Sequence, residues 1–349
     1  MEVITILIML APLGLVLWVA NLADRRIQMG PAESGRALSA LAYALLALLY
    51  AGLVFFGLMI QGTGLLAPQL LEGNPPIEGL DLSVLPRLGL SMWAPALVGL
   101  VLMMKPVRSL VDRFTDLDAT RVVHGVSLSM SALVLVNLLT LLAMGLTNVA
   151  EMMEAQSAAG IAYNPVPGLW AQNIGFFVVS LFGVGWLARR TLHVSLERLG
   201  IVVPNWQHVA VGVLAAFLLV PGILLLENLA ARVGVGADPS VERLTEQLVG
   251  PLTQSLPGIL TLGLAAALGE ESVFRGAMHP RFGLILTAVL FARLHSIYGI
   301  TFSTVAVLLV GLILGVLRTR YNTTTTMVTH ATYNMLLGII SYFGWLSNV

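Results

Sequence analysis

The sequence predicts an all-α protein, a polytopic transmembrane helical bundle with about ten spans. Of its 349 residues, 57% are hydrophobic and only 10% are Asp, Glu, Lys or Arg, whereas an ordinary soluble domain has about 25% charged residues. Apolar stretches of about 17 or more residues recur along the chain, and about 20 helical residues cross a hydrocarbon core of roughly 30 Å. These observations exclude a soluble globular protein.

The charge balance and the absence of cysteine exclude further classes. Lys plus Arg and Asp plus Glu each total 18, so no basic field favours nucleic acid as a partner. With no cysteine, the chain has no disulfide framework, thiol nucleophile, iron–sulfur cluster or cysteine zinc site.

The spans follow one another along the whole chain, and the eighth is short. Met1 and Glu2 precede the first span where a signal peptide has basic residues, which argues against a removable signal peptide. In order, the candidate spans are residues 4–20, 38–60, 87–104, 122–146, 169–187, 206–226, 254–281, 284–299, 301–317 and 325–344.

The distribution of Lys and Arg predicts the orientation, because cytoplasmic loops carry the positive excess. Only Arg87, Arg232, Arg243 and Arg293 fall on the side opposite the other fourteen. Both termini are then expected to face the extracytoplasmic side. The fourteen on the cytoplasmic side are Arg25, Arg26, Arg36, Lys105, Arg108, Arg113, Arg121, Arg189, Arg190, Arg198, Arg275, Arg281, Arg318 and Arg320.

Three regions are expected along the chain. Residues 1–226 hold N-terminal transmembrane helices without a motif. Residues 227–253 form an extracytoplasmic loop whose apolar/polar alternation from Pro239 suits a short amphipathic helix lying on the bilayer. Residues 254–349 form the third region, a transmembrane core that contains almost all the intramembrane ionisable residues.

Those ionisable residues form three short motifs, each inside an apolar span. Each such residue costs roughly 2.5–3.5 kcal/mol on membrane insertion scales, so it is a functional candidate by default. Two carboxylates, two imidazoles and an amide are thereby placed in the membrane. The motif residues are Glu270, Glu271 and Arg275, then His295, then His330 and Asn334.

The helix rise predicts that these motifs meet at one depth. Residues 279–283 contain Pro and Gly and are expected to form a tight hairpin. Glu270 and His295 then each lie about 16 Å from that turn, and His330 and Asn334 lie about 12 Å and 18 Å deep. Glu271 and Arg275 are four residues apart and can form an intrahelical ion pair, and His330 and Asn334 share one helix face.

The motifs EExxxR, FxxxH and HxxxN, in this order and each in its own span, resemble the CPBP family of intramembrane proteases. That family includes CAAX-processing endopeptidases and bacterial relatives linked to bacteriocin processing and immunity. The resemblance covers about residues 250–345 and implies an α-helical core that cleaves peptide bonds. It implies that Glu270 is the general base and His295 its partner on the attacking water. His330 and Asn334 would then stabilise the oxyanion, with Glu271 and Arg275 supporting the site.

The resemblance also bears on cofactor and substrate. No cofactor is favoured; the alternative is zinc or another divalent metal, for which Glu270, His295 and His330 supply three ligands with water in the fourth position. The expected partner is a peptide or a lipidated, membrane-associated protein in the bilayer, and the expected location is a bacterial plasma membrane.

Two other functions stay open on the sequence alone. A secondary transporter or proton relay also uses intramembrane Glu and His, and a non-catalytic immunity or scaffold protein would use the cluster as a structural network. Arg293 departs from the family pattern, which has a small or apolar residue there. Its side chain either pairs with Glu271, in competition with Arg275, or extends to the interface.

Overall fold

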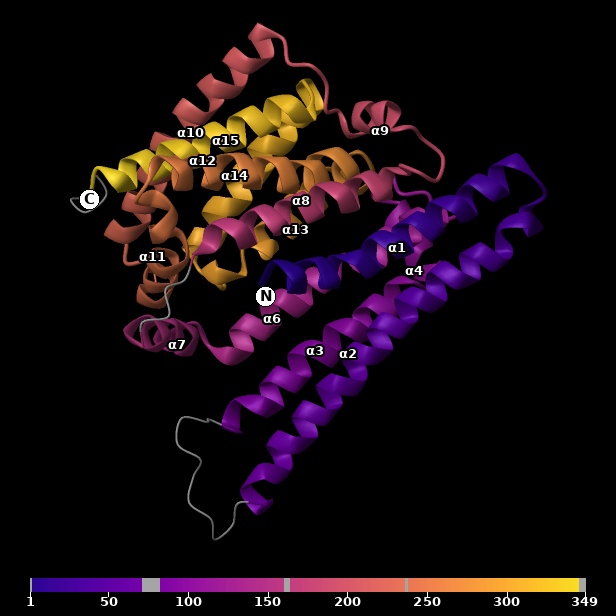
Figure 1. Cartoon of the computed structure of the whole chain (residues 1–349), viewed down its shortest axis with the longest axis horizontal. Coiled ribbons are helices and arrows are strands. Elements are labelled where there is room, and N and C mark those ends of the chain that lie inside the picture. The colour runs from indigo at the N-terminus through magenta and orange to yellow at the C-terminus, as the bar shows by residue number, and fades with distance from the viewer. Residues whose placement is uncertain (1, 71–81, 160–163, 236–237, 345–349) are drawn as a thin grey trace.

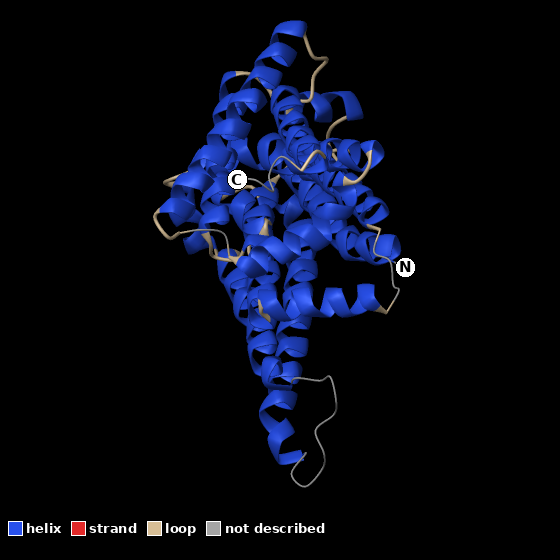
Figure 2. Cartoon of the chain, turned by 90° about the vertical axis from the view of Figure 1, so that its left-hand side faces the viewer, coloured by secondary structure: helices blue, strands red, loops and turns tan. Residues whose placement is uncertain are grey.

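The computed structural model describes residues 2–70, 82–159, 164–235 and 238–344 of the chain. Helices dominate these residues, and the ranges contain no strand beyond one isolated bridge between Trp186 and Arg190 (Figure 2). The all-α fold class predicted from the sequence is therefore confirmed.

The described part of the chain up to Leu199 contains four long helices, α1, α2, α3 and α8, and several short ones. Short 3₁₀ turns at Ala32–Gly35 and Leu82–Val84 precede α2 and α3. The helices are α1 Glu2–Met29, α2 Arg36–Leu70, α3 Leu85–Leu102, α4 Lys105–Asp112, α5 Val122–Met130, α6 Leu133–Met144, α7 Leu146–Ala158, α8 Pro165–Val184 and α9 Leu192–Leu199.

The second half contains the three motifs. A π-helical segment, Ser272–Met278, joins α12 to α13, and a 3₁₀ turn, Ser296–Tyr298, follows α13. The helices are α10 Trp206–Arg232, α11 Pro239–Thr253, α12 Leu256–Glu271, α13 His279–Leu294, α14 Phe302–Arg320 and α15 Thr323–Tyr342.

Each of the ten predicted spans is mostly helical, but 122–146 is divided into α5 and α6 at residues 131–132, and α13 ends at Leu294, before the predicted end of 284–299. Within the described ranges, eight helical stretches are long and apolar enough to cross a membrane, and the stretch Leu256–Leu294 contains two predicted spans. The tenth predicted span, α15, is helical but is not among the eight; it begins with four threonines, which make it less apolar. The chain is an integral membrane protein.

The helices divide into two groups that share α8 (Figure 1). Helices α2 and α3 pack along one another and extend away from the rest of the molecule. Helix α8 packs on α1 on one side and on α12 on the other, and α12 in turn packs on α15. The motif helices α12 and α15 thus lie on the side of α8 that faces away from α1.

Small residues let α12 approach both of its neighbours. A Cβ at Gly269 would lie 2.4 Å from Oδ1 of Asn173 in α8, and a Cβ at Gly263 would lie 2.7 Å from the carbonyl oxygen of Ala331 in α15. Both distances are too short for a side chain, so the helix backbones are nearly in contact. Such close packing by small residues holds helices together where lipid provides no hydrophobic driving force.

The chain reverses direction between the first two motifs. Nε2 of His295 lies 3.7 Å from Oε2 of Glu270, although 25 residues of straight helix would separate them by about 37 Å. Gly283 makes the turn, with φ 75° and ψ 175° inside α13. The hairpin predicted at residues 279–283 is confirmed.

Gly283→Ala is expected to destabilise the fold by about 1–3 kcal/mol, because this backbone region is adopted almost only by glycine. No atom lies within 4 Å of an added Cβ, so the cost is conformational. The thermal midpoint in detergent measures it. The control is Gly52→Ala in α2, where the added Cβ also meets nothing and the backbone is helical. Equal midpoints for the two variants would contradict the prediction.

The amphipathic helix predicted in the long loop is present as α11. Asp238 caps it by accepting a hydrogen bond from the backbone of Ser240 at 2.8 Å. Its apolar residues Val241 and Leu244 are buried, and the helix packs on α7 and α12 (Figure 1). At least part of its apolar face therefore packs on protein. A helix lying on the bilayer would instead present that face to lipid.

Candidate active site

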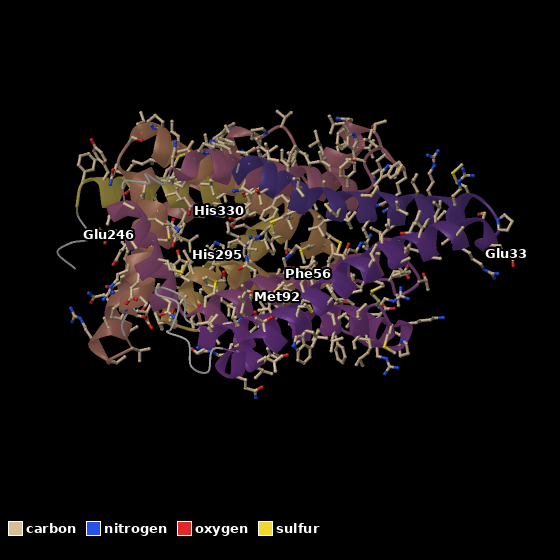
Figure 3. All side chains as sticks on the ribbon, turned by 60° about the horizontal axis from the view of Figure 1, so that its bottom comes forward. Glu33, Phe56, Met92, Glu246, His295 and His330 are labelled. Carbon is tan, nitrogen blue, oxygen red and sulfur yellow. The ribbon has the colours of Figure 1, made fainter. Side chains whose placement is uncertain are left out.

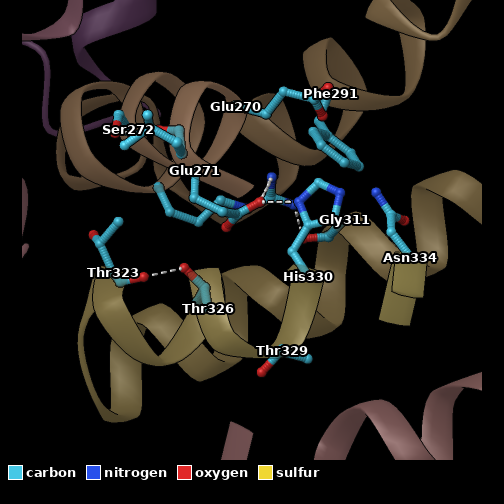
Figure 4. Close-up of polar contacts among 12 residues, drawn as sticks. Glu270, Glu271, Ser272, Phe291, Gly311, Thr323, Thr326, Thr329, His330 and Asn334 are labelled. Carbon is cyan, nitrogen blue, oxygen red and sulfur yellow. Dashed lines mark hydrogen bonds and ion pairs between the residues drawn. The ribbon is translucent and has the colours of Figure 1, made fainter. Parts of the chain in front are cut away.

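The centre of the site is a buried ion pair shared with a histidine. Glu271, the last residue of α12, is fully buried, and its Oε1 accepts a hydrogen bond from Nη1 of Arg275 at 3.0 Å. Nδ1 of His330, from α15, lies 2.9 Å from the same oxygen (Figure 4). The predicted Glu271–Arg275 pair is present, and it also binds the third motif to the first.

Arg275 has further partners that the sequence did not indicate. The side chain is 1% exposed, and its Nη2 donates to the carbonyl oxygen of Gly311 at 3.2 Å. The guanidinium also lies 4.0 Å from the centre of the Phe291 ring. A buried charge is tolerated when it is paired and hydrogen-bonded in this way.

Glu270 points away from this pair and toward His295. Its Oε2 lies 3.7 Å from Nε2 of His295, and that oxygen accepts no hydrogen bond from any side chain or backbone group that the structure describes. Nδ1 of His295 lies 3.0 Å from the carbonyl oxygen of Phe291. Because a carbonyl only accepts, Nδ1 carries the hydrogen and Nε2 is the acceptor in the neutral ring.

Phe291 separates the two halves of the site. Its ring centre lies 4.8 Å from that of His295 and 6.0 Å from that of His330, and Phe274 contacts it edge-on at 5.4 Å. The first residue of FxxxH therefore forms an apolar wall and also orients His295 through its carbonyl. The spacing alone gave no reason to assign either role.

Asn334 lies beside His330 on the same face of α15 (Figure 4). Its Nδ2 donates to the carbonyl oxygen of Leu262 in α12 at 3.2 Å. One amide hydrogen is therefore engaged in holding α15 to α12, and the second is available to another acceptor.

The site lies in the interior of the molecule. His295 and His330 are between Glu33 at one end and Glu246 at the other (Figure 3). The sequence-based expectation that all three motifs meet at one depth is met by the Glu270–His295 and Glu271–His330 contacts.

A π-helix directly follows the two glutamates, at Ser272–Met278. The wider turn adds a residue to the helix just where Arg275 must reach back to Glu271 and Gly311. Such segments are frequently found at functional sites. No sequence signal used above predicts it.

The three-ligand metal site considered as an alternative is not assembled. Across the described ranges, no three His, Asp or Glu side chains lie close enough together to hold a metal ion. Glu270 and His295 adjoin, but Nδ1 of His330 is turned to Glu271. The three proposed ligands therefore do not form one cluster in this structure.

Arg293 does not pair with Glu271. Oε1 of Glu271 is taken by Arg275 and His330, and Nη1 of Arg293 is buried without a hydrogen-bond partner in the described parts of the chain. Pairing of Arg293 with Glu271 in competition with Arg275 is therefore wrong. The structure offers no role for Arg293.

Comparison with known proteins places this site in a family. Residues 252–336 match the family model described as Type II CAAX prenyl endopeptidase Rce1-like, and all six motif residues lie inside that range. No curated protein and no solved structure matches the chain. The match agrees with the resemblance to CPBP intramembrane proteases. Residues 252–336 of this integral membrane protein therefore form an Rce1-like domain, similar to the type II CAAX prenyl endopeptidases, which are a family of proteases.

Proposed function

We propose that this protein is an intramembrane endopeptidase that hydrolyses a peptide bond in a membrane-associated substrate, with water activated by Glu270 and His295. The observation that carries the proposal is the facing pair of acceptors: Oε2 of Glu270 and Nε2 of His295 lie 3.7 Å apart. Neither atom has a hydrogen to offer when the carboxylate is ionised and the imidazole is neutral.

Two acceptors at this spacing orient a water molecule for attack. The water donates one hydrogen to Glu270 and one to His295, which leaves an oxygen lone pair directed at the substrate carbonyl. As the C–O bond forms, Glu270 takes the proton as general base. The same carboxyl then gives it to the amine that leaves when the C–N bond breaks, so the protons balance.

His330 and Asn334 are assigned to the oxyanion. Nδ1–H of His330 donates to Glu271, so Nε2 donates to an oxyanion only when the ring is the imidazolium. The Glu271 carboxylate stabilises that cation, and Arg275 fixes the carboxylate in place. The free amide hydrogen of Asn334 supplies a second donor. Donors fixed in advance around a developing negative charge are usually the largest single contribution to catalysis.

The substrate class follows from the family name and from the position of the site. A CAAX prenyl endopeptidase acts on a prenylated peptide end, and a site buried among membrane helices suits a peptide that a lipid or apolar anchor brings to the bilayer. Lipidated or membrane-associated proteins are therefore the proposed substrates. Both termini are proposed to lie on the extracytoplasmic side of a bacterial plasma membrane.

The test is cleavage of a quenched fluorescent peptide library, with and without lipidated members, by the purified full-length protein. We expect cleavage by the wild type, no cleavage by Glu270→Ala, and full activity of Glu242→Gln, an exposed glutamate on α11. Activity is expected to survive a strong chelator, because the proposed steps use only side chains. Chelator-sensitive cleavage would replace this mechanism with a metal-dependent one. An absence of Glu270-dependent cleavage would favour the transport or structural functions.

A further inference from the structure

A second polar feature lies away from the motif residues, in a cavity between the ends of four helical elements. The cavity measures about 80 Å³ and is bordered by the start of α5, the end of α8, helix α9 and the hairpin that begins α13. No Asp or Glu is part of its lining. The polar side chains with long reach in that lining are Arg189, Arg190, Arg198, Arg281 and His124.

The four arginines come from separate parts of the chain and converge only in the folded protein. Arg189 and Arg190 follow α8, Arg198 lies in the last turn of α9, and Arg281 lies in the hairpin. Helix α9 packs on both α8 and the π-helical segment, which brings these parts together (Figure 1). All four side chains are half-buried.

Three of these charges lack a counterion in the described part of the chain; the fourth, Arg189, is attracted by the Asp24 carboxylate but forms no ion pair with it. Arg198 and Arg281 make no hydrogen bond or ion pair to any described residue, and the buried Nε atoms of Arg189 and Arg281 have no acceptor there. The side chain of Arg190 donates only to the backbone oxygen of Val184 among the described residues. Buried charges in proteins are normally paired, so this arrangement calls for an anion from outside.

The carboxylates of Asp24 and Asp118 make their hydrogen bonds and ion pairs with groups other than the cavity arginines. Asp24 accepts hydrogen bonds from the backbone N–H groups of Val122 and Val123, at 2.8 and 3.3 Å, and so caps α5. Asp118 pairs with Arg121 at 3.4 Å. Neither carboxylate is part of the cavity lining.

The arginines also repel one another. Burial, together with nearby Arg281, lowers the pKa of Arg198 to about 10, and burial with nearby Arg190 lowers the pKa of Arg189 to about 10. Both groups still carry their charge at neutral pH. A bound anion would relieve this repulsion and hold the four cations together.

Each of the four arginines and His124 offers a hydrogen-bond donor to the cavity. Nδ1 of His124 accepts from the backbone N–H of Asp118 at 2.9 Å, so Nε2 carries the hydrogen of the neutral ring. The arginines are donors only. A set of donors around one point selects an anion with several oxygens, and guanidinium groups bind phosphate through paired hydrogen bonds.

Size and position narrow the choice of anion. A water molecule needs roughly 10–15 Å³ of such space, so 80 Å³ admits a group of several heavy atoms. The cavity is lined by residues at the end of one candidate membrane span, Pro165–Val184, and at the start of another, Val122–Met144, and the orientation predicted from the sequence puts its four arginines on the cytoplasmic side. Basic pockets at that level bind lipid head groups.

We propose that this arginine cavity binds a phosphate group, as presented by an anionic phospholipid, and that the bound phosphate joins α8, α9 and the α13 hairpin.

The experiment follows the thermal midpoint of the full-length protein in a neutral detergent. The three probes are short-chain phosphatidylglycerol, inorganic phosphate and zwitterionic short-chain phosphatidylcholine. Wild type is compared with Arg198→Gln, Arg281→Gln and the control Arg320→Gln, an exposed arginine outside the cavity lining. We expect phosphatidylglycerol to raise the wild-type midpoint. Each cavity variant should need about tenfold more phosphatidylglycerol, or a still higher concentration, for the same rise in midpoint, because it has lost a hydrogen bond to a charged group. Arg320→Gln should need the same concentration as wild type.

The comparison of phosphatidylglycerol with inorganic phosphate identifies the source of the phosphate, and the midpoint of Arg198→Gln without ligand separates lost binding from lost stability. Stabilisation by phosphatidylglycerol alone assigns a lipid, and equal stabilisation by inorganic phosphate assigns free phosphate; both support the cavity as a phosphate site. Without ligand, Arg198→Gln should melt no lower than wild type, because it removes a repelled charge. The proposal would be overturned if neither phosphate probe raised the wild-type midpoint, or if phosphatidylcholine raised it equally. It would also be overturned if the cavity variants needed no more phosphatidylglycerol than wild type.

Discussion

Glu270→Gln is expected to lower kcat for peptide cleavage by roughly 10²–10⁴-fold, the range that a general base contributes. The amide keeps the size and the hydrogen-bonding carbonyl of the side chain but takes no proton from the water. His295 still accepts from that water, so substrate binding should change little. The effect therefore falls on kcat, and steady-state kinetics on a peptide from the library measures it.

Stability separates this loss from misfolding. Glu270 is 8% exposed, and a neutral amide costs less to bury than a carboxylate, so Glu270→Gln should melt at or above the wild-type midpoint. Glu242→Gln, on the exposed face of α11, should leave both kcat and the midpoint unchanged. A folded Glu270→Gln variant with wild-type kcat would mean that another group is the base.

Glu271→Gln is expected to cost about 3–5 kcal/mol of folding free energy, because it leaves Arg275 as a buried charge without its partner. The Gly311 carbonyl and the Phe291 ring remain, but neither carries a charge. His330 also loses the carboxylate that stabilises its protonated form, so cleavage falls as well. Reversible unfolding in mixed micelles, or the thermal midpoint where unfolding is irreversible, measures the loss.

The double variant Glu271→Gln with Arg275→Met is the matched comparison. It removes both charges, and replacing a buried ion pair with uncharged side chains is often close to neutral. Its midpoint should lie above that of Glu271→Gln alone, although cleavage stays low. Midpoints that fall additively would show that the two charges act independently, contrary to the 3.0 Å contact.

The sequence predicted the elements of this fold because each membrane helix can be recognised from the apolar character of its own residues. Each predicted span needs only its own residues to be apolar, and the hairpin needs only the Pro and Gly of residues 279–283. The common depth of Glu270, His295 and His330 then follows from counting residues along helices of known rise. Local information of this kind was sufficient to locate the site.

The partners within the site could not be predicted, because they depend on how helices rotate and cross. The sequence allowed Glu271 to pair with Arg275 or with Arg293, and only packing decides for Arg275. The contact of His330 with Glu271 requires α15 to lie close to α12, which Gly263 permits. The arginine cavity assembles residues 189 to 281 through helix α9, whose place against α8 no local pattern specifies.

Helix α8 has a consequence for what counts as a self-sufficient unit of this protein. It lies at residues 165–184, far upstream of the matched range 252–336, yet it covers the face of α12 where Gly269 meets Asn173. In a polypeptide beginning at residue 252, that face of α12 would contact lipid, although its small residues allow it to pack closely against another helix. We therefore expect that the matched range 252–336 is smaller than the smallest piece able to insert and fold alone, which must include α8.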